Sequence, residues 1–237
     1  MQLFYSPDID IKTQNFTFNK EESRHIIRVL RKKEGDILFI TDGKGFLIKA
    51  EINHANDKKC MVQILSFKKQ PKTWNYHLHI AIAPTKMNDR FEWFLEKATE
   101  IGIDEITPII CDNSERKVLK TERMQKVLVS AMKQSLKFKL PKLNEAIKFS
   151  EFIRNNSADI KLIAHCEDPD KKNTIKNLVK SDKNILILIG HEGDFSTKEI
   201  SLALQHQFIP LSLGSSRLRT ETAGIVACSS ISIINEK

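Results

Sequence analysis

The segments NILILIGHEGDFSTKEI (Asn184–Ile200) and IPLSLGSSRLRTETAGIVA (Ile209–Ala227) decide the fold. Each begins with a short aliphatic run, continues into a loop that contains glycine, and leads into a helix start. Aliphatic runs of this length are typical of strands that are covered on both faces. Loops that follow adjacent parallel strands meet at one edge of an α/β sheet, where such folds bind their ligands. The two segments therefore predict one ligand-binding crevice, in which glycine lets the backbone approach the ligand closely.

Strand and helix patterns alternate along the chain from residue 77 onward. Ser196 and Glu199 form a capping-box pattern at one predicted helix start, and Gly102 is placed to end another helix. Alternation of this kind predicts βα units and a mostly parallel sheet. The predicted strands are 77–83, 104–110, 160–165, 185–189 and 209–213, and the predicted helices are 91–101, 122–136, 174–180, 197–205 and 221–235.

The first third of the chain is basic and rich in strand patterns. Residues 1–73 contain 14 Lys and Arg against 9 Asp and Glu, which is typical of a module that binds a polyanion such as nucleic acid. One helix is predicted from Asn19 to about Lys33, where the spacing of Arg24, Arg28 and Arg31 places them on one face. A solvated helix surface is the alternative explanation of these arginines. Strands are predicted at 36–41, 46–52 and 61–67, with a hairpin turn at 42–45 and a domain linker at 68–73.

Composition and cysteine usage exclude several classes of protein. The chain has 237 residues, 41% hydrophobic and 29% charged, as expected of a soluble globular protein. We expect a cytoplasmic protein, because no signal peptide and no membrane span is recognised. The four cysteines are far apart and are expected to be reduced. His77 and His79 lack a nearby third ligand, so no metal site is predicted.

Motifs that would name a common reaction are missing. The sequence has no GxGxxG for a dinucleotide, no GxxxxGK[ST] phosphate loop and no GxSxG nucleophile motif in the expected contexts. A backbone-lined crevice beside a basic module favours a small or nucleotide-like ligand together with RNA. The residues alone do not identify the reaction.

Five segments, taken together and in order, resemble the RsmE family of 16S rRNA uridine-N3 methyltransferases, which belongs to the SPOUT superfamily. Any one segment would be weak evidence for the family, but the five together span nearly the whole chain. The segments are SRHIIRVLRKKEGD (Ser23–Asp36), KMNDRFEWFLEKATEIGIDEITPI (Lys86–Ile109), SAMKQS (Ser130–Ser135), IGHEGDFSTKEI (Ile189–Ile200) and LSLGSSRLRTETAGIVA (Leu211–Ala227).

The resemblance implies a fold class, a cofactor and partners. It implies a small PUA-like β-barrel domain at 1–70 that binds RNA. A SPOUT-type methyltransferase domain would follow at 74–237, with a mostly parallel sheet, helices on both faces and a carboxyl-terminal trefoil knot. The cofactor would be S-adenosylmethionine, and the substrate 16S rRNA of the small ribosomal subunit. A homodimer through the last helix is also implied, and this agrees with apolar residues on more than one face of that helix.

The resemblance assigns cofactor binding to three loops at the crevice. Main-chain groups of these loops would hold the cofactor in a bent shape, while leucine side chains pack on its ring. The residues are His165, Glu167, Gly190, His191, Gly193, Leu213, Gly214, Leu218, Arg219 and Thr222.

The reaction requires removal of the uracil N3 proton, and positioning with electrostatic stabilisation can supply much of the rate. We expect Arg219 to stabilise the negative charge that develops on uracil. Glu192 or Glu221 is expected to accept the proton, although a carboxylate in a first helical turn, such as Glu221, also stabilises the helix. Arg116 and Gln134 are expected to place the base.

RNA contacts are expected in both domains. Arg24, Arg28 and Arg31 would bind phosphates from the barrel, and Lys86 and Arg90 from the methyltransferase domain. Phosphate contacts position the RNA and make its binding sensitive to salt.

Two positions depart from the pattern of the family. His191 stands where the family usually has proline, which frees the loop and restores a backbone N–H. After Gln134, the family tends to carry an arginine, whereas this chain has Lys137 and Lys139, which lack the bidentate guanidinium.

Other functions remain open at this level. One is a SPOUT enzyme that modifies a different RNA nucleotide, and another is an RNA-binding ribosome assembly factor without turnover. A nucleotide hydrolase is disfavoured by the missing phosphate loop.

Overall fold

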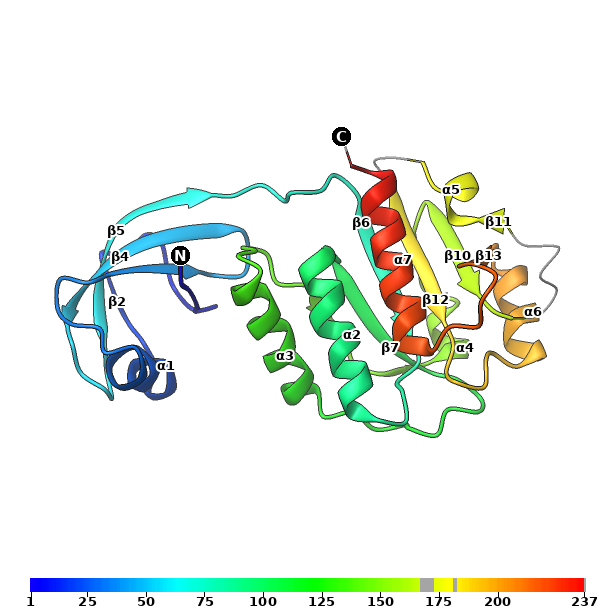
Figure 1. The fold of residues 1–237 in the computed structure, drawn as a ribbon, viewed down its shortest axis with the longest axis horizontal. Helices are drawn as coiled ribbons and strands as arrows, with labels where there is room; N and C mark the ends of the chain where they lie inside the picture. The colour runs from blue at the N-terminus through cyan, green and yellow to red at the C-terminus, as the bar shows by residue number, and fades with distance from the viewer. Residues whose placement is uncertain (167–172, 181–182, 237) are drawn as a thin grey trace. The chain divides into compact units, whose positions relative to one another are not determined.

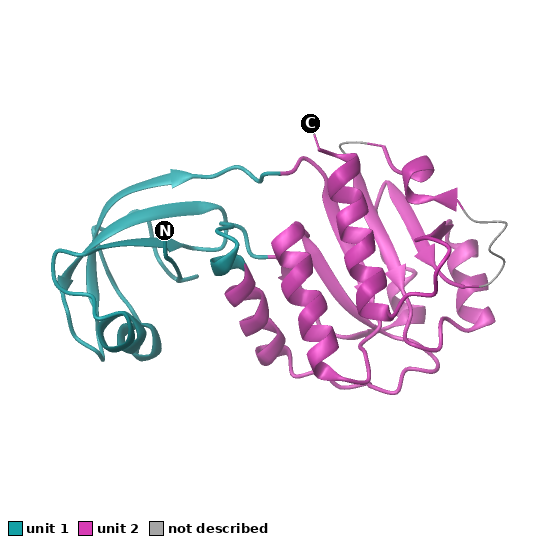
Figure 2. Ribbon diagram, viewed as in Figure 1, with its two compact units in different colours: residues 1–73, 132–140 teal, residues 74–131, 141–237 magenta. Residues whose placement is uncertain are grey.

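The computed structural model describes residues 1–166, 173–180 and 183–236. The chain forms two compact units, shown in different colours in Figure 2. The first contains residues 1–73 and 132–140, and the second contains residues 74–131 and 141–237.

The first unit is built on a five-stranded sheet in the order β1-β3-β4-β5-β2. β1 runs parallel to β3, and the other pairs are antiparallel. Phe4, Phe18, Ile26, Ile40 and Ile48 are among the buried residues of its core. The strands are β1 (Leu3–Tyr5), β2 (Asn15–Thr17), β3 (Ile37–Thr41), β4 (Phe46–His54) and β5 (Met61–Lys69).

The helix of the first unit differs from the prediction. Asn19 caps α1 (Lys20–Arg24) by accepting from the Glu22 N–H, as expected. The backbone then widens into a π-helical turn, η1 (His25–Val29), and Arg31 lies beyond it at φ +54°. The prediction that Arg24, Arg28 and Arg31 share one helical face was therefore wrong, because the pattern assumed a regular α-helix that runs to Lys33.

Residues 132–140 complete the first unit from a distant part of the sequence. The Phe138 carbonyl accepts from the Gly45 N–H at 2.9 Å and from the Thr41 hydroxyl at 3.1 Å. The Leu140 N–H donates to the Gly43 carbonyl at 2.9 Å. The hairpin turn between β3 and β4 is thus held by Phe138 and Leu140, a contact that was not predicted from the sequence.

The second unit contains one sheet in the order β11-β13-β10-β12-β6-β7-β8, with β9 also paired to β7. All of these pairs are parallel, as predicted from the alternation of strands and helices. The strands are β6 (His77–Ile82), β7 (Glu105–Ile110), β8 (Lys142–Leu143), β9 (Ile147–Lys148), β10 (Ile160–Ala164), β11 (Asn173–Thr174), β12 (Asn184–Ile189) and β13 (Ile209–Ser212).

Helices cover both faces of this sheet. Figure 1 shows α2 and α7 side by side on one face. On the other face, α4 and α6 bury Phe149, Phe152 and Ile200 against Leu186 and Leu188 of β12. The helices are α2 (Asn88–Ile101), α3 (Thr121–Gln134), α4 (Phe149–Phe152), α5 (Ile175–Leu178), α6 (Thr197–Gln205) and α7 (Thr220–Ile234).

The chain after β13 returns across the sheet. β10 and β12 separate β13 from β6, yet α7 contacts β6, β12 and α2. This return crossing is expected of the trefoil knot that the family resemblance implies. Close packing of α7 against α2 depends on Gly224, where a Cβ would lie 2.5 Å from Cε2 of the Phe94 ring. No helix among the described residues could cross a membrane.

Most predicted helix ends agree with the structure. Ser196 and Glu199 form the predicted capping box of α6, and Gly102 ends α2 at φ +136°. β5 continues to Lys69, through the start of the predicted linker, because it stays paired with β4 as far as Phe46. The short elements β1, β2, β8, β9, β11 and α4 were not predicted.

Candidate functional site

A cavity of about 410 Å³ lies at the carboxyl ends of β10, β12 and β13, where the sequence predicted a crevice. Its volume is within the range of small-molecule sites. Three loops and the first turns of α7 form its wall. The lining residues are Ala164, His165, Cys166, Ile189, Gly190, His191, Glu192, Asp194, Leu211, Ser212, Leu213, Gly214, Ser215, Ser216, Arg217, Leu218, Thr220 and Ala223.

Asp194 joins the first two loops. Its carboxylate Oδ2 accepts from the Cys166 N–H at 2.6 Å, although the residues are 28 positions apart. Asp194 has φ +69°, a left-handed conformation that Asp and Asn tolerate better than most residues. The residue thus orients one loop while its side chain holds the other.

The second loop turns tightly around an imidazole. His191 Nδ1 accepts from the Gly193 N–H at 2.8 Å, and the His191 carbonyl accepts from the Asp194 N–H at 2.9 Å. A Cβ at residue 193 would lie 2.6 Å from Cε1 of the ring. A side chain at residue 193 would displace the imidazole from this position.

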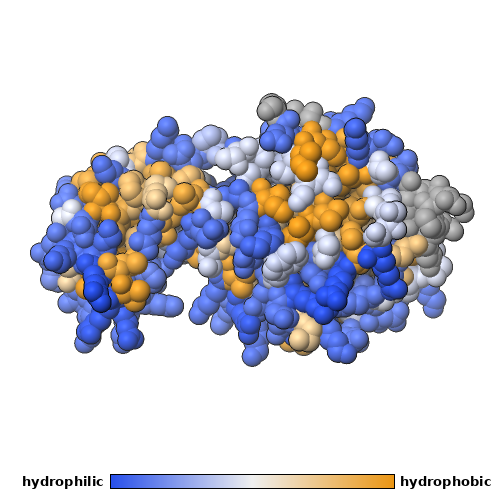
Figure 3. Space-filling model, in the orientation of Figure 1, coloured by the Kyte–Doolittle hydropathy of each residue, from blue (hydrophilic) through white to orange (hydrophobic). Residues whose placement is uncertain are grey.

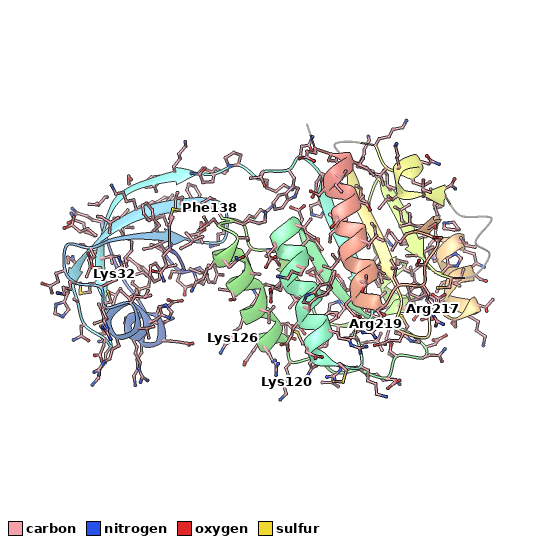
Figure 4. All side chains as sticks on the ribbon, viewed as in Figure 1. Lys32, Lys120, Lys126, Phe138, Arg217 and Arg219 are labelled. Atoms are coloured by element: carbon pink, nitrogen blue, oxygen red, sulfur yellow. The ribbon has the colours of Figure 1, made fainter. Side chains whose placement is uncertain are left out.

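The third loop leads from β13 into α7. Gly214 has φ +129°, and a Cβ there would meet nothing within 4 Å, so the loop leaves open space beside its backbone. Arg217 Nη2 donates to the Glu192 carbonyl at 3.4 Å and links this loop to the second. Arg219 is exposed at the N-cap of α7, between Leu218 and Thr220, which line the cavity. Figure 4 labels Arg217 and Arg219 at this end of the helix.

A polar cluster adjoins the second loop. Glu192 lines the cavity, and its Oε1 accepts from the Lys86 N–H at 3.2 Å. Arg116 Nη2 donates to the Lys86 carbonyl at 2.6 Å, and Lys86 Nζ pairs with Glu115 at 3.0 Å. Arg116 Nε is buried and has no hydrogen-bond acceptor within the described part of the chain. The structure thus brings the predicted residues Arg116, Lys86 and Glu192 together.

Two other predicted residues form a pair in the first turns of α2 and α7. Arg90 Nε lies 3.9 Å from Glu221 Oε1. Glu221 is only 6% exposed, and its Oε2 accepts no hydrogen bond from the residues that the structure describes. Burial of a carboxylate beside a single guanidinium is costly, so this pair is a candidate for a role beyond packing.

The structure separates the predicted cofactor residues into two groups. His165, Gly190, His191, Leu213, Gly214 and Leu218 line the cavity, whereas Gly193, Arg219 and Thr222 are in its loops or helix without forming its wall. Glu167 lies outside the described residues. Gln134 is exposed at the end of α3, in the first compact unit.

The predicted RNA-binding residues are partly engaged within the protein. Arg28 Nη2 pairs with Asp57 at 2.6 Å, while Lys86 and Arg90 have the contacts given above. Asp194 and Arg217 were not predicted to belong to the site, although both are polar residues within the two glycine loops. They could have been proposed because they are adjacent in sequence to Gly193 and Leu218, which were predicted to bind the cofactor.

The site contains the groups needed to bind a polar organic ligand. Backbone groups and leucines form its wall, and Glu192, Asp194 and Arg217 supply charges of both signs. No group of three or more potential metal ligands occurs among residues 1–166, 173–180 and 183–236. The arrangement can bind a nucleoside-like molecule.

Comparison with known proteins gives consistent matches. Residues 72–232 match the family described as RNA methyltransferase domain, and residues 18–65 match the RNA methyltransferase PUA domain. A Buchnera aphidicola protein named ribosomal RNA small subunit methyltransferase E is 31% identical over 97% of this chain and 92% of its own length. These matches confirm the predicted fold class, in which a PUA-like domain precedes an α/β methyltransferase domain.

Solved structures are similar over the same length. A probable rRNA-methyltransferase from Porphyromonas gingivalis has a TM-score of 0.92 and 42% identity, covering 99% of this chain and 98% of its own. A ribosomal RNA small subunit methyltransferase E from Neisseria gonorrhoeae, bound to S-adenosyl methionine, has a TM-score of 0.84 and 25% identity, covering 98% and 97%.

Proposed function

The chain belongs to the RNA methyltransferase family that includes ribosomal RNA small subunit methyltransferase E, and we propose that it methylates N3 of a uridine in 16S rRNA. The methyl donor is S-adenosylmethionine, which is bound in a solved relative of the same length. The observation that carries the proposal is the cavity that three loops form at the carboxyl ends of β10, β12 and β13. Such a substrate would be met on ribosomal subunits in the cytoplasm.

The residues of the cavity fit this cofactor. Open space at Gly214 allows an adenosine group to approach the backbone, and Leu213 and Leu218 offer apolar surfaces for its ring. Asp194 and Arg217 hold the three loops to one another, so that the wall is formed before a ligand enters. When bound, the cofactor supplies a sulfonium methyl group for transfer to a nucleophile.

The proton on uracil N3 needs an acceptor at the cavity. Glu192 is the better placed of the two predicted carboxylates, because it lines the cavity whereas Glu221 does not. The Lys86 N–H holds Glu192 Oε1, which leaves Oε2 to receive the proton directly or through water. Glu221 would instead orient Arg90.

Arg219 would stabilise the negative charge on the uracil oxygens as the N3 proton leaves. It stands at the N-cap of α7 and is exposed beside the cavity. Positive charge and backbone N–H groups at a helix start both favour an anion there. Arg116, held by the Lys86 carbonyl, would place the base.

We also propose a homodimer that uses the α7 face of the second unit. Figure 3 shows apolar side chains gathered over α7 and the adjacent part of α2. Ile233 is 68% exposed on α7 and Trp93 is 43% exposed on α2. A contiguous apolar surface of this kind commonly marks a protein interface.

The test uses small ribosomal subunits that lack the modification, incubated with the protein and S-adenosylmethionine. The expected product in the rRNA nucleosides is 3-methyluridine. A different methylated nucleoside would show a related enzyme with another target. Binding of the cofactor without any methyl transfer would instead identify a non-catalytic assembly factor.

A further inference from the structure

His191 accepts a hydrogen bond that only a neutral imidazole can accept. The donor is the Gly193 backbone N–H, 2.8 Å from Nδ1. A backbone N–H cannot reverse its role, so Nδ1 must carry a lone pair and the ring proton must be on Nε2. The geometry of this turn therefore requires one protonation state and one tautomer of His191.

The hydrogen bond lies at the junction of all three loops. The turn that it closes presents Asp194 to the Cys166 N–H of the first loop and the Glu192 carbonyl to Arg217 of the third. The ring itself lines the cavity and packs directly on Gly193. A change in the conformation of this turn would consequently alter the positions of all three loops that form the cavity wall.

We propose that His191 is a positioning residue that holds the loops in their cofactor-binding arrangement only while its imidazole is neutral. This inference rests on the proposed function, since the ligand concerned is S-adenosylmethionine. Protonation would place an Nδ1–H donor against the Gly193 N–H donor and break the hydrogen bond. Affinity for the cofactor would then decrease as the solution becomes acidic.

Other charged groups line the same cavity as the His191 ring. Glu192 and Asp194 belong to the same loop, and Arg217 belongs to the third loop. His165 and Cys166 of the first loop also line the cavity and can titrate. Variants of residue 191 leave all five groups in place, so the differences between variants isolate the effect of His191.

Asparagine provides a matched variant. Its Oδ1 can accept from the N–H two residues onward, as in an Asx turn, and does not titrate in the relevant range. His191→Asn retains the acceptor without the pH sensitivity. His191→Ala removes the acceptor at every pH.

The experiment measures S-adenosylmethionine affinity of the full chain by calorimetry at pH 8.0 and pH 5.5. We expect wild-type affinity to decrease about tenfold in acid, because imidazoles change charge between about pH 5 and 8. The ratio of the affinity at pH 8.0 to the affinity at pH 5.5 should be much smaller for His191→Asn. At pH 8.0, His191→Ala should bind about fivefold more weakly than wild type, as for one lost hydrogen bond, and His191→Asn should recover part of that loss.

A second readout is the Gly193 amide resonance in the ligand-free protein. It should move with a single pH transition in wild type and lose that transition in His191→Asn. The inference alone would be overturned if the affinity ratio between pH 8.0 and pH 5.5 were equal for wild type and His191→Asn. It would also be overturned if the chemical shift of the Gly193 amide did not change with pH. Failure of the wild-type protein to bind S-adenosylmethionine at pH 8.0 would overturn the proposed function as well.

Discussion

The Asp194 carboxylate connects two loops of the cavity, so its removal tests whether loop geometry sets affinity. Asp194→Ala removes the acceptor of the Cys166 N–H and places alanine at φ +69°. We expect S-adenosylmethionine to bind about tenfold more weakly, from a lost hydrogen bond to a charged group. Asp194→Asn keeps both an acceptor and a residue that tolerates this conformation, and should lose much less. Equal losses for the two variants would contradict the role given to the side chain.

Arg219 is predicted to act on the reaction more than on cofactor binding. Arg219→Ala should reduce the single-turnover rate of methyl transfer, at saturating cofactor, by about 10²–10³, the range for loss of one stabilising donor. The dissociation constant of the cofactor should change little. Arg154, an exposed arginine next to α4, provides the control substitution to alanine. A wild-type rate for Arg219→Ala would exclude the proposed role.

His79 connects the stability of the second unit to pH. Its Nε2 is 2.7 Å from the Thr107 hydroxyl, and burial lowers its pKa from 6.5 to about 4. A lowered pKa means that the unfolded chain binds the proton more readily than the folded chain. The stabilising contribution is therefore complete above about pH 6.5 and is lost as pH falls toward about 4.

Unfolding in urea at pH 7 and pH 5, followed by tryptophan fluorescence, would measure this contribution, since Trp74 and Trp93 both lie in the second unit. Wild type should lose about 1–2 kcal/mol more than His79→Gln on acidification, given roughly 1.4 kcal/mol per pKa unit. The exposed His54→Gln variant should follow wild type. Parallel pH dependences of wild type and His79→Gln would show that burial of His79 does not set the effect.

At the level of single residues, the sequence predicted the glycine loops but not their connections. Lys86, Arg116 and Glu192 meet in space although Glu192 follows Lys86 by 106 positions. Such a contact depends on which strands are neighbours in the sheet, and strand order is not encoded in a local pattern. The hydrogen bond within the His191–Gly193 turn is local, but it depends on a side-chain orientation that the sequence does not specify.

At the level of elements, the contact between α7 and α2 depends on Gly224. In Gly224→Ala the new methyl carbon would lie 2.5 Å from Phe94 Cε2 and 3.2 Å from Ile82 Cδ1. Alanine favours helix by roughly 1 kcal/mol, but overpacking of a filled core costs about 1–3 kcal/mol. We expect a net decrease in the free energy of unfolding, measured by urea titration.

A second substitution separates the clash from other effects. Phe94→Leu leaves room beside residue 224, so the double variant Gly224→Ala/Phe94→Leu should be more stable than the sum of the single changes predicts. Strict additivity would show that the methyl group and the Phe94 ring do not compete for the same space.

Regular elements were predictable where sequence signals and packing agree. α2 follows an amphipathic pattern that ends at Gly102, α6 follows one that begins with a capping box, and α7 follows an apolar pattern without a side-chain cap. Strands of two or three residues, such as β1 and β11, form because a partner strand offers its edge. The π-helical turn of η1 could not be predicted, since helical periodicity assumes a constant number of residues per turn.

At the level of the whole molecule, the proposed dimer gives a direct prediction. Ile233→Glu places a charge on the apolar α7 face and should shift the protein from dimer to monomer in light scattering after size exclusion. Leu204→Glu is the matched control, because Leu204 is a 45% exposed leucine on α6. A monomeric wild type, or equal behaviour of the two variants, would refute the proposed interface.

The attachment of residues 132–140 to the first unit also has a consequence for how the protein is made. Translation releases the β3–β4 hairpin long before Phe138 and Leu140 have been added to the growing chain. Until then the Gly45 N–H, the Thr41 hydroxyl and the Gly43 carbonyl have only water in place of their later partners. The amino-terminal unit therefore cannot make these contacts while only its first 73 residues have been synthesised, and its completion awaits all of α3 and the chain as far as Leu140.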